Sequence, residues 1–428
     1  MTVLIAGAGI GGLTMALSLH QIGVKARIFE AVPEIRPLGV GINVQPHAVR
    51  ELEELGLLPA LDATGLRTKE VAYYSSHGGL IWSEPRGRDA GYNWPQFSIH
   101  RGRLQMLLLD AVRERLGPDA IRTGVSVEDF RDSGDGIEVD LAEHRDGQTR
   151  PLGQAQGSLL IAADGIHSRA RAILYPGEGK PAWGGTVMWR GVTSGPRFLT
   201  GRTMAMAGCK ARKFVCYPIA DEGDAGSTIN WICDLQFPQD YLWNREDWNR
   251  PGKLEDFLPR FADWHFPWLD VPEIIRTASY VYEYPMVDRD PLPAWTRGRM
   301  TLMGDAAHSM YPIGSNGASQ AILDARVLAR EILAQGQTPE ALAAYEADRR
   351  PVTTKIVLAN RADGPDKVLD IVEERAPDGF GHIDEVLSRD ELAEAASAYK
   401  RIAGFDKDAL NVRPPIVPVA AASAAESA

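Results

Sequence analysis

A glycine cluster near the start of the chain has the residue types and spacing of a phosphate-binding turn. Gly7-Ala8-Gly9-Ile10-Gly11-Gly12 follows the apolar run Val3–Ala6, and a second run, Ala26–Phe29, ends on Glu30. The first glycine permits a tight turn, Gly9 lets the backbone approach a pyrophosphate, and Gly12 allows close helix–strand packing. The start of the following helix attracts phosphate, and Glu30 can accept hydrogen bonds from a ribose. We therefore predict a dinucleotide site, against the alternative of a glycine-rich turn that binds nothing.

Two further motifs with carboxylates stand after apolar runs much later in the chain. Asp164-Gly165 follows Ser158–Ala163, and Gly304-Asp305 follows Met300–Met303. The end of a buried strand is a typical position for a loop that contacts a ligand. We therefore consider all three motifs as parts of a candidate site.

The elements that must position these motifs are of α/β type in the first part of the chain. Helical periodicity is expected from Pro46 to Leu58 and from Leu104 to Leu116, between strand-like runs. From Gly184 to Pro285, short β-type runs follow one another with few helical stretches, which indicates an inserted antiparallel sheet. Helices return after Gly317 and again after Thr338, which is a plausible N-cap.

Composition limits the classes of partner. The chain has 428 residues, and its 46 basic and 57 acidic residues give a formal net charge of −11, which argues against a broad nucleic-acid surface. No apolar stretch is long enough to span a membrane, and we expect no signal peptide because the first strand begins by residue 3. Cys209, Cys216 and Cys233 form no CxxC pair. We expect them to be thiols in a reducing cytoplasm, and we predict no metal site.

The three motifs together resemble those of the single-component flavoprotein aromatic hydroxylases, the p-hydroxybenzoate hydroxylase-like family. The resemblance covers about residues 2–360. Stretches such as SIHRGRLQM, MWRGVT and LMGDAAHSMYPIGSNGASQAILD are most similar to those of bacterial phenazine monooxygenases acting on 5-methylphenazine-1-carboxylate. The segment after about residue 365 has no recognisable counterpart.

The resemblance implies an α/β fold with a Rossmann-like FAD-binding domain of the glutathione-reductase type, an inserted antiparallel-sheet substrate domain and a helical C-terminal region. Residues 1–182 would form the first part of the FAD-binding domain, with a small strand-rich excursion at 68–100. Residues 183–290 would form the substrate domain, and residues 291–365 would complete the FAD-binding domain and add C-terminal helices. Residues 366–428 are expected to be a variable segment with a disordered tail from Pro414.

The resemblance also implies which residues hold FAD. The glycine cluster and Glu30 would bind its ADP half, Arg101 would reach the FAD chain, and Asp164 would contact FAD and the nicotinamide cofactor. Asp305 would bind ribityl or ribose hydroxyls, and the nearby His308 would have a structural role. Further cofactor positions implied near the flavin are Gly41, Gly304, Gly314, Asn316 and Gly317. The helix that starts near Gly317 would point its positive end at the flavin and favour the reduced anion.

The implied activity is that of a monooxygenase. NADH or NADPH would reduce bound FAD, O2 would add to give a C4a-hydroperoxyflavin, and one oxygen would pass to an aromatic or N-heteroaromatic ring, with or without decarboxylation. The substrate would be a small aromatic acid of the phenazine, pyridine or benzoate type. The protein would supply orientation and water exclusion, with no side chain needed as a nucleophile. We expect a cytoplasmic monomer or homodimer that binds neither nucleic acid nor membrane.

Substrate contacts are expected where the inserted sheet faces the loop from Pro312 to Gly317. Arg190 could pair with a substrate carboxylate, or lie at the surface as strand arginines usually do. Tyr217 could hydrogen-bond a ring substituent, or belong to the core. The other candidates are Trp189, Trp231, Met286 and Pro312, with Ile42 and His47 from the first domain.

Two other functional classes are compatible with a dinucleotide motif. One is a flavoprotein of the same fold with different chemistry, such as a halogenase or a reductase, although the WxWxIP phrase of such halogenases does not occur here. The other is a non-catalytic dinucleotide-binding module. The intact Asp164-Gly165 and Gly304-Asp305 motifs argue against that module, because a scaffold needs no contacts to ribityl or flavin groups.

Overall fold

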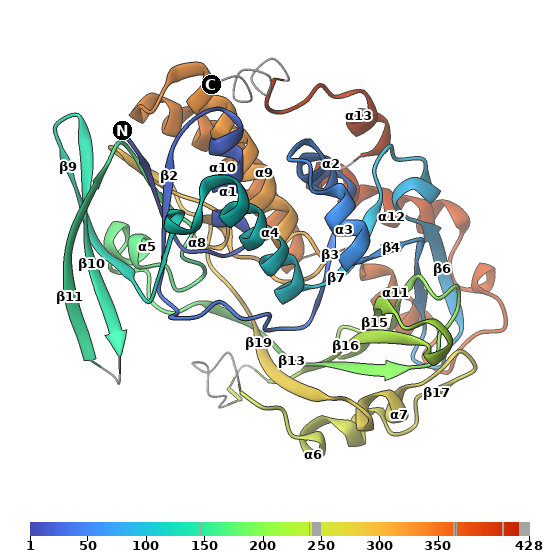
Figure 1. The fold of residues 1–428 in the computed structure, drawn as a ribbon. Coiled ribbons are helices and arrows are strands. Elements are labelled where there is room, and N and C mark those ends of the chain that lie inside the picture. Colours follow the sequence, from blue (N-terminus) through green and yellow to red (C-terminus); the bar gives the residue numbers. More distant parts are fainter. Residues whose placement is uncertain are drawn as a thin grey trace.

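The structure is a computed structural model that describes residues 1–145, 148–238, 240, 241, 250–362, 364, 366–404 and 406–418. A mostly parallel, six-stranded sheet forms the centre of the first domain (Figure 1). The strand order is β20-β21-β12-β1-β2-β8, and each neighbouring pair is parallel except β20 and β21. The strands are β1 (Val3–Ala6), β2 (Ala26–Glu30), β8 (Ile121–Thr123), β12 (Leu160–Ala162), β20 (Thr296–Arg297) and β21 (Met300–Leu302). The predicted strand, glycine turn and helix at the N-terminus are confirmed.

Helices pack around this sheet and form its hydrophobic core with it. Helix α1 begins within the glycine cluster, directly after Gly9, and contacts both α4 and α9. Thr338 caps α10, because its hydroxyl accepts a hydrogen bond from the backbone N–H of Ala341. The helices of this part are α1 (Ile10–Gln21), α2 (Pro46–Glu54), α3 (Leu58–Thr64), α4 (Arg101–Leu116), α5 (Arg169–Leu174), α8 (Asp305–His308), α9 (Gly317–Gln335) and α10 (Pro339–Arg361).

A second, seven-stranded sheet contains most of the strands from β13 to β19 and confirms the predicted inserted sheet. Its order is β19-β13-β16-β15-β14-β5-β6, with antiparallel pairs throughout except between β14 and β5. The strands are β5 (Glu70–Tyr74), β6 (Leu80–Pro85), β13 (Ala182–Gly195), β14 (Thr203–Cys209), β15 (Arg212–Asp221), β16 (Ser227–Gln236) and β19 (Tyr280–Asp288).

The strand-rich stretch that we assigned to the first domain extends this second sheet. Strand β5 pairs in parallel with β14, from Thr203 opposite Glu70 to Ala207 opposite Tyr74. The backbone of β14 would otherwise form an open sheet edge, which β5 and β6 cover. Residues 70–85 therefore belong spatially to the inserted sheet, although the chain reaches them long before residue 183.

The two faces of the seven-stranded sheet have different neighbours. The outer face packs against α6 (Leu254–Phe257), the 3-10 turn Leu258–Phe261 and α7 (Val271–Arg276), with Trp231, Phe257 and Trp264 in the core between them. The inner face carries Met188, Arg190 and Tyr217, because side chains alternate along a strand. Arg190 and Tyr217 both bond the backbone of Gly41, so this face is turned toward the first domain.

Smaller elements complete the described chain. Two three-stranded antiparallel sheets are present, β3-β7-β4 and the projecting arm β9-β10-β11 at the left of Figure 1. Their bounds, with those of the short pair β17-β18, are β3 (Gly41–Val44), β4 (Leu66–Thr68), β7 (Gln96–His100), β9 (Ser126–Ser133), β10 (Gly136–Arg145), β11 (Gln148–Gly157), β17 (His265–Phe266) and β18 (Leu269–Asp270). The C-terminal helices are α11 (Lys367–Arg375), α12 (Arg389–Ala403) and α13 (Lys407–Val412).

The C-terminal segment is packed against the rest of the molecule. Helix α11 lies on β14, and its Val368, Leu369 and Val372 join the apolar cluster of the inner face. The disorder predicted from Pro414 is wrong at its start, because Ile416 and Val417 are buried in the core of the first domain. The rest of that predicted tail, from residue 419, lies outside the described residues.

Candidate functional site

The three sequence motifs meet at one edge of the parallel sheet. Gly7 follows β1, Glu30 ends β2, Asp164 follows β12, and Gly304 follows β21. These strands are adjacent in the order β21-β12-β1-β2 and run in the same direction. Ligands of open α/β sheets bind in the crevice beyond the carboxyl ends of the strands. The fold therefore brings residues more than a hundred positions apart to one site.

The glycine turn has the local geometry that close ligand approach requires. A Cβ on Gly12 would lie 2.1 Å from the Gly7 carbonyl oxygen, and one on Gly7 would lie 2.4 Å from the Ala163 carbonyl oxygen. A Cβ on Gly9 would instead meet no protein atom within 4 Å. Gly7 and Gly12 are thus required by packing, whereas Gly9 leaves space in front of the first turn of α1, where phosphate binds favourably.

The Glu30 carboxylate is fixed by backbone hydrogen bonds. Its two oxygens accept bonds from the N–H of Ala8 at 2.7 Å and of Val32 at 2.9 Å. Gln105 on α4 donates from Nε2 to the Ala8 carbonyl oxygen at 2.8 Å. Carboxylate oxygens have further lone pairs, so Glu30 can still accept hydrogen bonds from ribose hydroxyls.

Asp164 is held close to the glycine turn, at the start of α5. One carboxylate oxygen accepts a bond from the N–H of Arg169 at 2.8 Å, while Oδ1 is buried without a hydrogen-bond donor among the described residues. Burial raises the pKa of Asp164, although hydrogen bonds from Ser168 and from backbone N–H groups oppose this. An orphaned buried carboxylate oxygen beside a ligand site can accept a bond from a ligand donor.

The Gly304-Asp305 turn is braced from within the protein. Gly304 has a φ of +60°, which favours glycine, and its N–H donates to Asp324 Oδ2 at 3.0 Å. The same oxygen lies 2.5 Å from His308 Nε2, and Arg349 Nε donates to the other oxygen at 2.7 Å. Burial opposes ionisation of Asp324, but His308 and Arg349 outweigh it and lower its pKa to about 2. His308 therefore has a buried partner, and the exposed Asp305 is directed outward.

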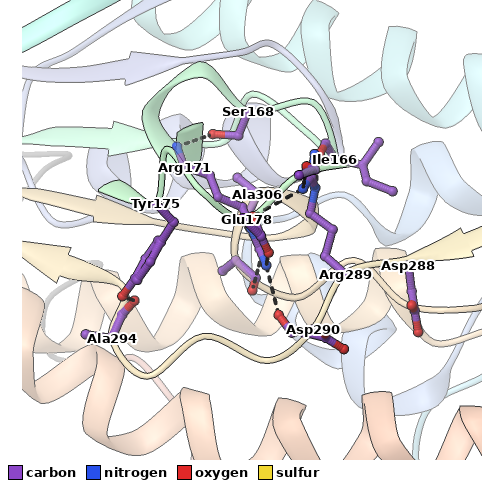
Figure 2. A network of polar contacts seen from close by, with 12 residues as sticks. Ile166, Ser168, Arg171, Tyr175, Glu178, Asp288, Arg289, Asp290, Ala294 and Ala306 are labelled. Carbon is purple, nitrogen blue, oxygen red and sulfur yellow. Dashed lines mark hydrogen bonds and ion pairs between the residues drawn. The ribbon is translucent and has the colours of Figure 1, made fainter. Parts of the chain in front are cut away.

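Arg171, on α5, also braces this turn (Figure 2). Its Nη1 donates to the carbonyl oxygens of Ala306 and Ala307, both at 3.1 Å, and its Nη2 donates to the Asp290 carbonyl oxygen at 2.8 Å. Nε bonds Glu178 at 2.8 Å, and Glu178 also pairs with Arg289. The segment after Asp164 is thereby joined to the segment that carries Asp305.

The remaining cofactor candidates lie in the loop before α9, at the start of β3 and at the starts of α1, α4 and α9. Gly314 and Ser315 both have positive φ angles, +79° and +53°, just before the buried Asn316 and the first residue of α9, Gly317. Gly41 is the first residue of β3, where a Cβ would lie 2.6 Å from Asn230 Cβ. Arg101, the first residue of α4, is exposed beside Gly39. Ile10 is buried at the start of α1.

The structure brings together some of the predicted substrate residues and separates others. Met286 packs with Met188 and Tyr311 on the inner face of the seven-stranded sheet, next to the exposed Pro312. Arg190 and Tyr217 lie on the same face. Ile42 in β3 and the buried His47 in α2 come from the first domain, as expected.

Trp189 and Trp231 point the other way. Trp189 stacks on Phe257 of α6 at 5.0 Å between ring centroids, and a Cβ on Gly191 would lie 2.3 Å from Trp231. Both tryptophans are 3% exposed or less and belong to the core of the outer face. The prediction that Trp189 and Trp231 contact the substrate is therefore wrong, because their side chains are buried on the opposite face of the sheet.

Several residues that support the site had not been identified from the sequence. They are Asp324, Arg349 and Gln320 behind the Gly304 turn, Gln105 behind the glycine cluster, and Asn230 beside Gly41. A signal existed for Asp324, because it interrupts an otherwise apolar stripe on α9. Among the described residues, no cluster of histidine, cysteine and acidic side chains could hold a metal ion. No described helix is long and apolar enough to cross a membrane.

Comparison with known proteins identifies the ligand of this site. A family model described as FAD binding domain matches residues 1–189 and 282–360. This chain belongs to that family. Phenazine 1,6-dicarboxylic acid hydroxylase of Lysobacter antibioticus is 50% identical over 365 residues, which are 84% of this chain and 89% of that protein. Aurachin C monooxygenase/isomerase of Stigmatella aurantiaca is 35% identical over 82% of this chain and 85% of that protein.

Solved structures agree on the fold. A salicylate hydroxylase substrate complex superposes with a TM-score of 0.71 at 22% identity and covers 97% of this chain and 98% of that one. HpxO of Klebsiella pneumoniae, complexed with FAD and uric acid, also gives 0.71, at 23% identity and 96% coverage of each chain. The chain is thus a flavoprotein monooxygenase of the aromatic hydroxylase class, with FAD as its bound cofactor and NAD(P)H as its reductant.

The residues present fit FAD. The open space at Gly9 suits a pyrophosphate, the fixed Glu30 carboxylate suits a ribose, and the outward Asp305 suits polyol hydroxyls. When bound, FAD supplies the redox and oxygen chemistry. The protein's own residues orient the two ring systems, exclude water and fix the carboxylates where hydroxyl donors are needed.

Proposed function

We propose that this monooxygenase hydroxylates a planar N-heteroaromatic carboxylic acid of the phenazine type. One atom of O2 enters the ring as a hydroxyl group, and the other leaves as water with the two electrons of NADH or NADPH. Where the hydroxyl replaces a carboxyl group, CO2 is released instead of a ring proton. The 50% identical hydroxylase, whose name specifies a phenazine dicarboxylic acid, supports this substrate class.

One structural observation carries the proposal. The apolar cluster of Met188, Met286 and Tyr311, joined by Ile313 and Tyr284, connects the inner face of the seven-stranded sheet with the loop before α9. A flat ring between this cluster and the flavin would be covered on both sides. Apolar contacts would exclude water from such a ring. The flexible, polarisable methionine side chains can adapt their shape to it.

The oligomeric state and the cellular compartment are part of the same proposal. We propose a monomer or homodimer in the cytoplasm, and the free, buried thiols of Cys216 and Cys233 are consistent with a reducing compartment. Light scattering of the purified holoenzyme tests the oligomeric state.

The decisive experiment is a substrate screen. Purified yellow holoenzyme is incubated with NADH or NADPH and, in separate reactions, with phenazine-1-carboxylate, phenazine-1,6-dicarboxylate, salicylate or 6-hydroxynicotinate. We expect a phenazine acid to stimulate NAD(P)H oxidation and O2 uptake most, and mass spectrometry to show a product with one added oxygen, with or without loss of CO2. Stimulation by the single-ring acids alone, or consumption of NAD(P)H with unchanged phenazines, would contradict the proposal.

A further inference from the structure

Arg190 on β13 has unused hydrogen-bonding capacity in a half-buried position. Its Nη2 donates to the Gly41 carbonyl oxygen at 2.8 Å, while Nε is buried and has no acceptor among the described residues. A guanidinium keeps its charge in proteins and presents its donors in a planar fork that matches a carboxylate. The edge formed by Nε and Nη2 is therefore suited to bind an anion.

The arginines that are fully buried among the described residues have carboxylate partners. Arg171 pairs with Glu178, and Arg349 pairs with Asp324 at 2.7 Å. Arg190 forms no ion pair with any carboxylate of the described ranges. The charge of Arg190 acts on Asp234 of the neighbouring strand β16, but Asp234 Oδ2 already lies 3.3 Å from the ammonium group of Lys213. Arg190 thus differs from the arginines that serve the fold.

The bond from Arg190 to Gly41 is not needed to hold the backbone in place. The Gly41 carbonyl oxygen also accepts a hydrogen bond from Tyr217 Oη at 2.8 Å, and the Gly41 N–H donates to Asn230 Oδ1 at 2.6 Å. If the guanidinium turns to another acceptor, the carbonyl keeps one donor. Rearrangement of Arg190 therefore leaves no buried backbone group unpaired.

The position of Arg190 matches one end of a planar ligand. Arg190 stands two residues from Met188 on the inner face of β13, and the register sets them opposite Tyr282 and Tyr284 of β19. Met188 and Tyr284 belong with Met286 to the apolar cluster beside the loop before α9. An aromatic ring on this cluster would place a ring carboxylate toward Arg190.

We infer that Arg190 determines substrate specificity by binding the ring carboxylate through Nε and Nη2, in exchange for part of its contact with Gly41. The inference rests on the proposed function, because it names the residue that recognises the acid group of that substrate. Charged hydrogen bonds are stronger than neutral ones, so loss of the fork is expected to weaken acid binding about 10- to 100-fold, equal to about 1.4–2.8 kcal/mol.

The test compares binding of a matched pair of ligands, phenazine-1-carboxylate and phenazine-1-carboxamide, to oxidised holoenzyme without NAD(P)H. The dissociation constant is measured from the change in flavin absorbance or by calorimetry, so turnover is not required. We expect the original protein to prefer the acid, Arg190→Gln to lose that preference while binding the amide as before, and Arg190→Lys to be intermediate. Absence of an acid preference in the original protein would overturn the inference.

A second variant separates charge recognition from support of the backbone. Tyr217→Phe removes the other donor to the Gly41 carbonyl oxygen but leaves the guanidinium in place. We expect it to keep the acid-to-amide ratio of dissociation constants, even if both affinities change. If Arg190→Gln weakens acid and amide equally, or if Tyr217→Phe abolishes the preference as well, Arg190 acts through Gly41 and the inference is wrong. Failure of the proposed function would appear separately, as acid binding that depends on Arg190 without hydroxylated product.

Discussion

Two alanine substitutions in the glycine cluster should have opposite consequences. In Gly12→Ala the new methyl group would lie 2.1 Å from the Gly7 carbonyl oxygen and 3.4 Å from Ile5 Cγ2. In Gly9→Ala it would meet no protein atom within 4 Å, and the φ of −72° and ψ of −179° at Gly9 are open to any residue. We predict that Gly12→Ala destabilises the fold and that Gly9→Ala weakens FAD binding.

The magnitudes follow from these contacts. An ordinary contact between a methyl carbon and an oxygen is about 3.3 Å, so at Gly12 two backbone segments must separate by about 1 Å, and overpacking of this kind costs about 1–3 kcal/mol. At Gly9 the reduced freedom of the unfolded chain stabilises by about 0.4–1 kcal/mol, which offsets the poorer N-cap. Stability should therefore change by less than about 0.5 kcal/mol. The methyl group obstructs the pyrophosphate, and we expect FAD affinity to fall at least about tenfold, equal to about 1.4 kcal/mol.

The assay measures the two properties separately. Urea unfolding of the FAD-free proteins, followed by tryptophan fluorescence, gives the free energy of unfolding, and titration with FAD gives the dissociation constant. The reasoning fails if Gly9→Ala binds FAD as tightly as the original protein. It also fails if Gly12→Ala without FAD is as stable as the original.

Two further predictions concern buried charges. Burial, followed by the charges of Arg413 and Arg349, lowers the pKa of His47 to about 3, so below pH of about 6.5 the unfolded chain binds a proton that the folded protein excludes. The contribution of His47 to stability is therefore complete above that pH and is lost as pH falls toward 3, with about 1.4 kcal/mol lost at pH of about 5.5. His47→Gln should remove this part of the dependence of the unfolding free energy on pH, measured by urea unfolding. An unchanged pH dependence would refute the assignment. Lys213 lies 3.3 Å from Asp234 and 2.5 Å from Asp366. Lys213→Met should cost about 3–5 kcal/mol, because it leaves the buried Asp234 and the half-buried Asp366 without their cation. Proteases should then cleave residues 366–404 faster in Lys213→Met than in the control Asp366→Asn, which keeps the pair of Lys213 with Asp234. Equal cleavage rates in the two variants would contradict this role of Lys213.

The parts of the site that could be predicted from sequence are those with local causes. The glycine spacing, the apolar run before it and Glu30 at the end of the next run all lie within one strand–helix–strand unit. Asp164 and Asp305 could be predicted for the same reason, because Asp164 directly follows a short apolar run and Asp305 follows another after one glycine. Carboxyl ends of neighbouring parallel strands then bring these local features to one place.

The sequence predicts which residues of the inserted sheet share a face. It does not predict which face is turned inward, because that depends on distant segments. Trp189 and Arg190 are neighbours on one strand, so side-chain alternation alone requires opposite faces. Which face is inward is decided by α6 and α7, which cover Trp189 and Trp231, and by Gly41, which bonds Arg190. The pairing of β5 with β14 is equally non-local, since it joins strands more than a hundred residues apart.

The short helix α8 shows why the supporting residues matter for function. Its first turn is fixed at Gly304 by Asp324, from α9, and its last carbonyl groups are fixed by Arg171, from α5. Asp324 thus holds the Gly304 N–H and His308 Nε2, while Arg171 holds the carbonyl oxygens of Ala306 and Ala307. Asp305 lies between them and remains exposed. A carboxylate on a doubly fixed turn loses little conformational entropy when a ligand binds. The buried charges of Asp324 and Arg171 would therefore favour binding of a hydroxyl donor by Asp305, the cofactor role that the sequence predicts.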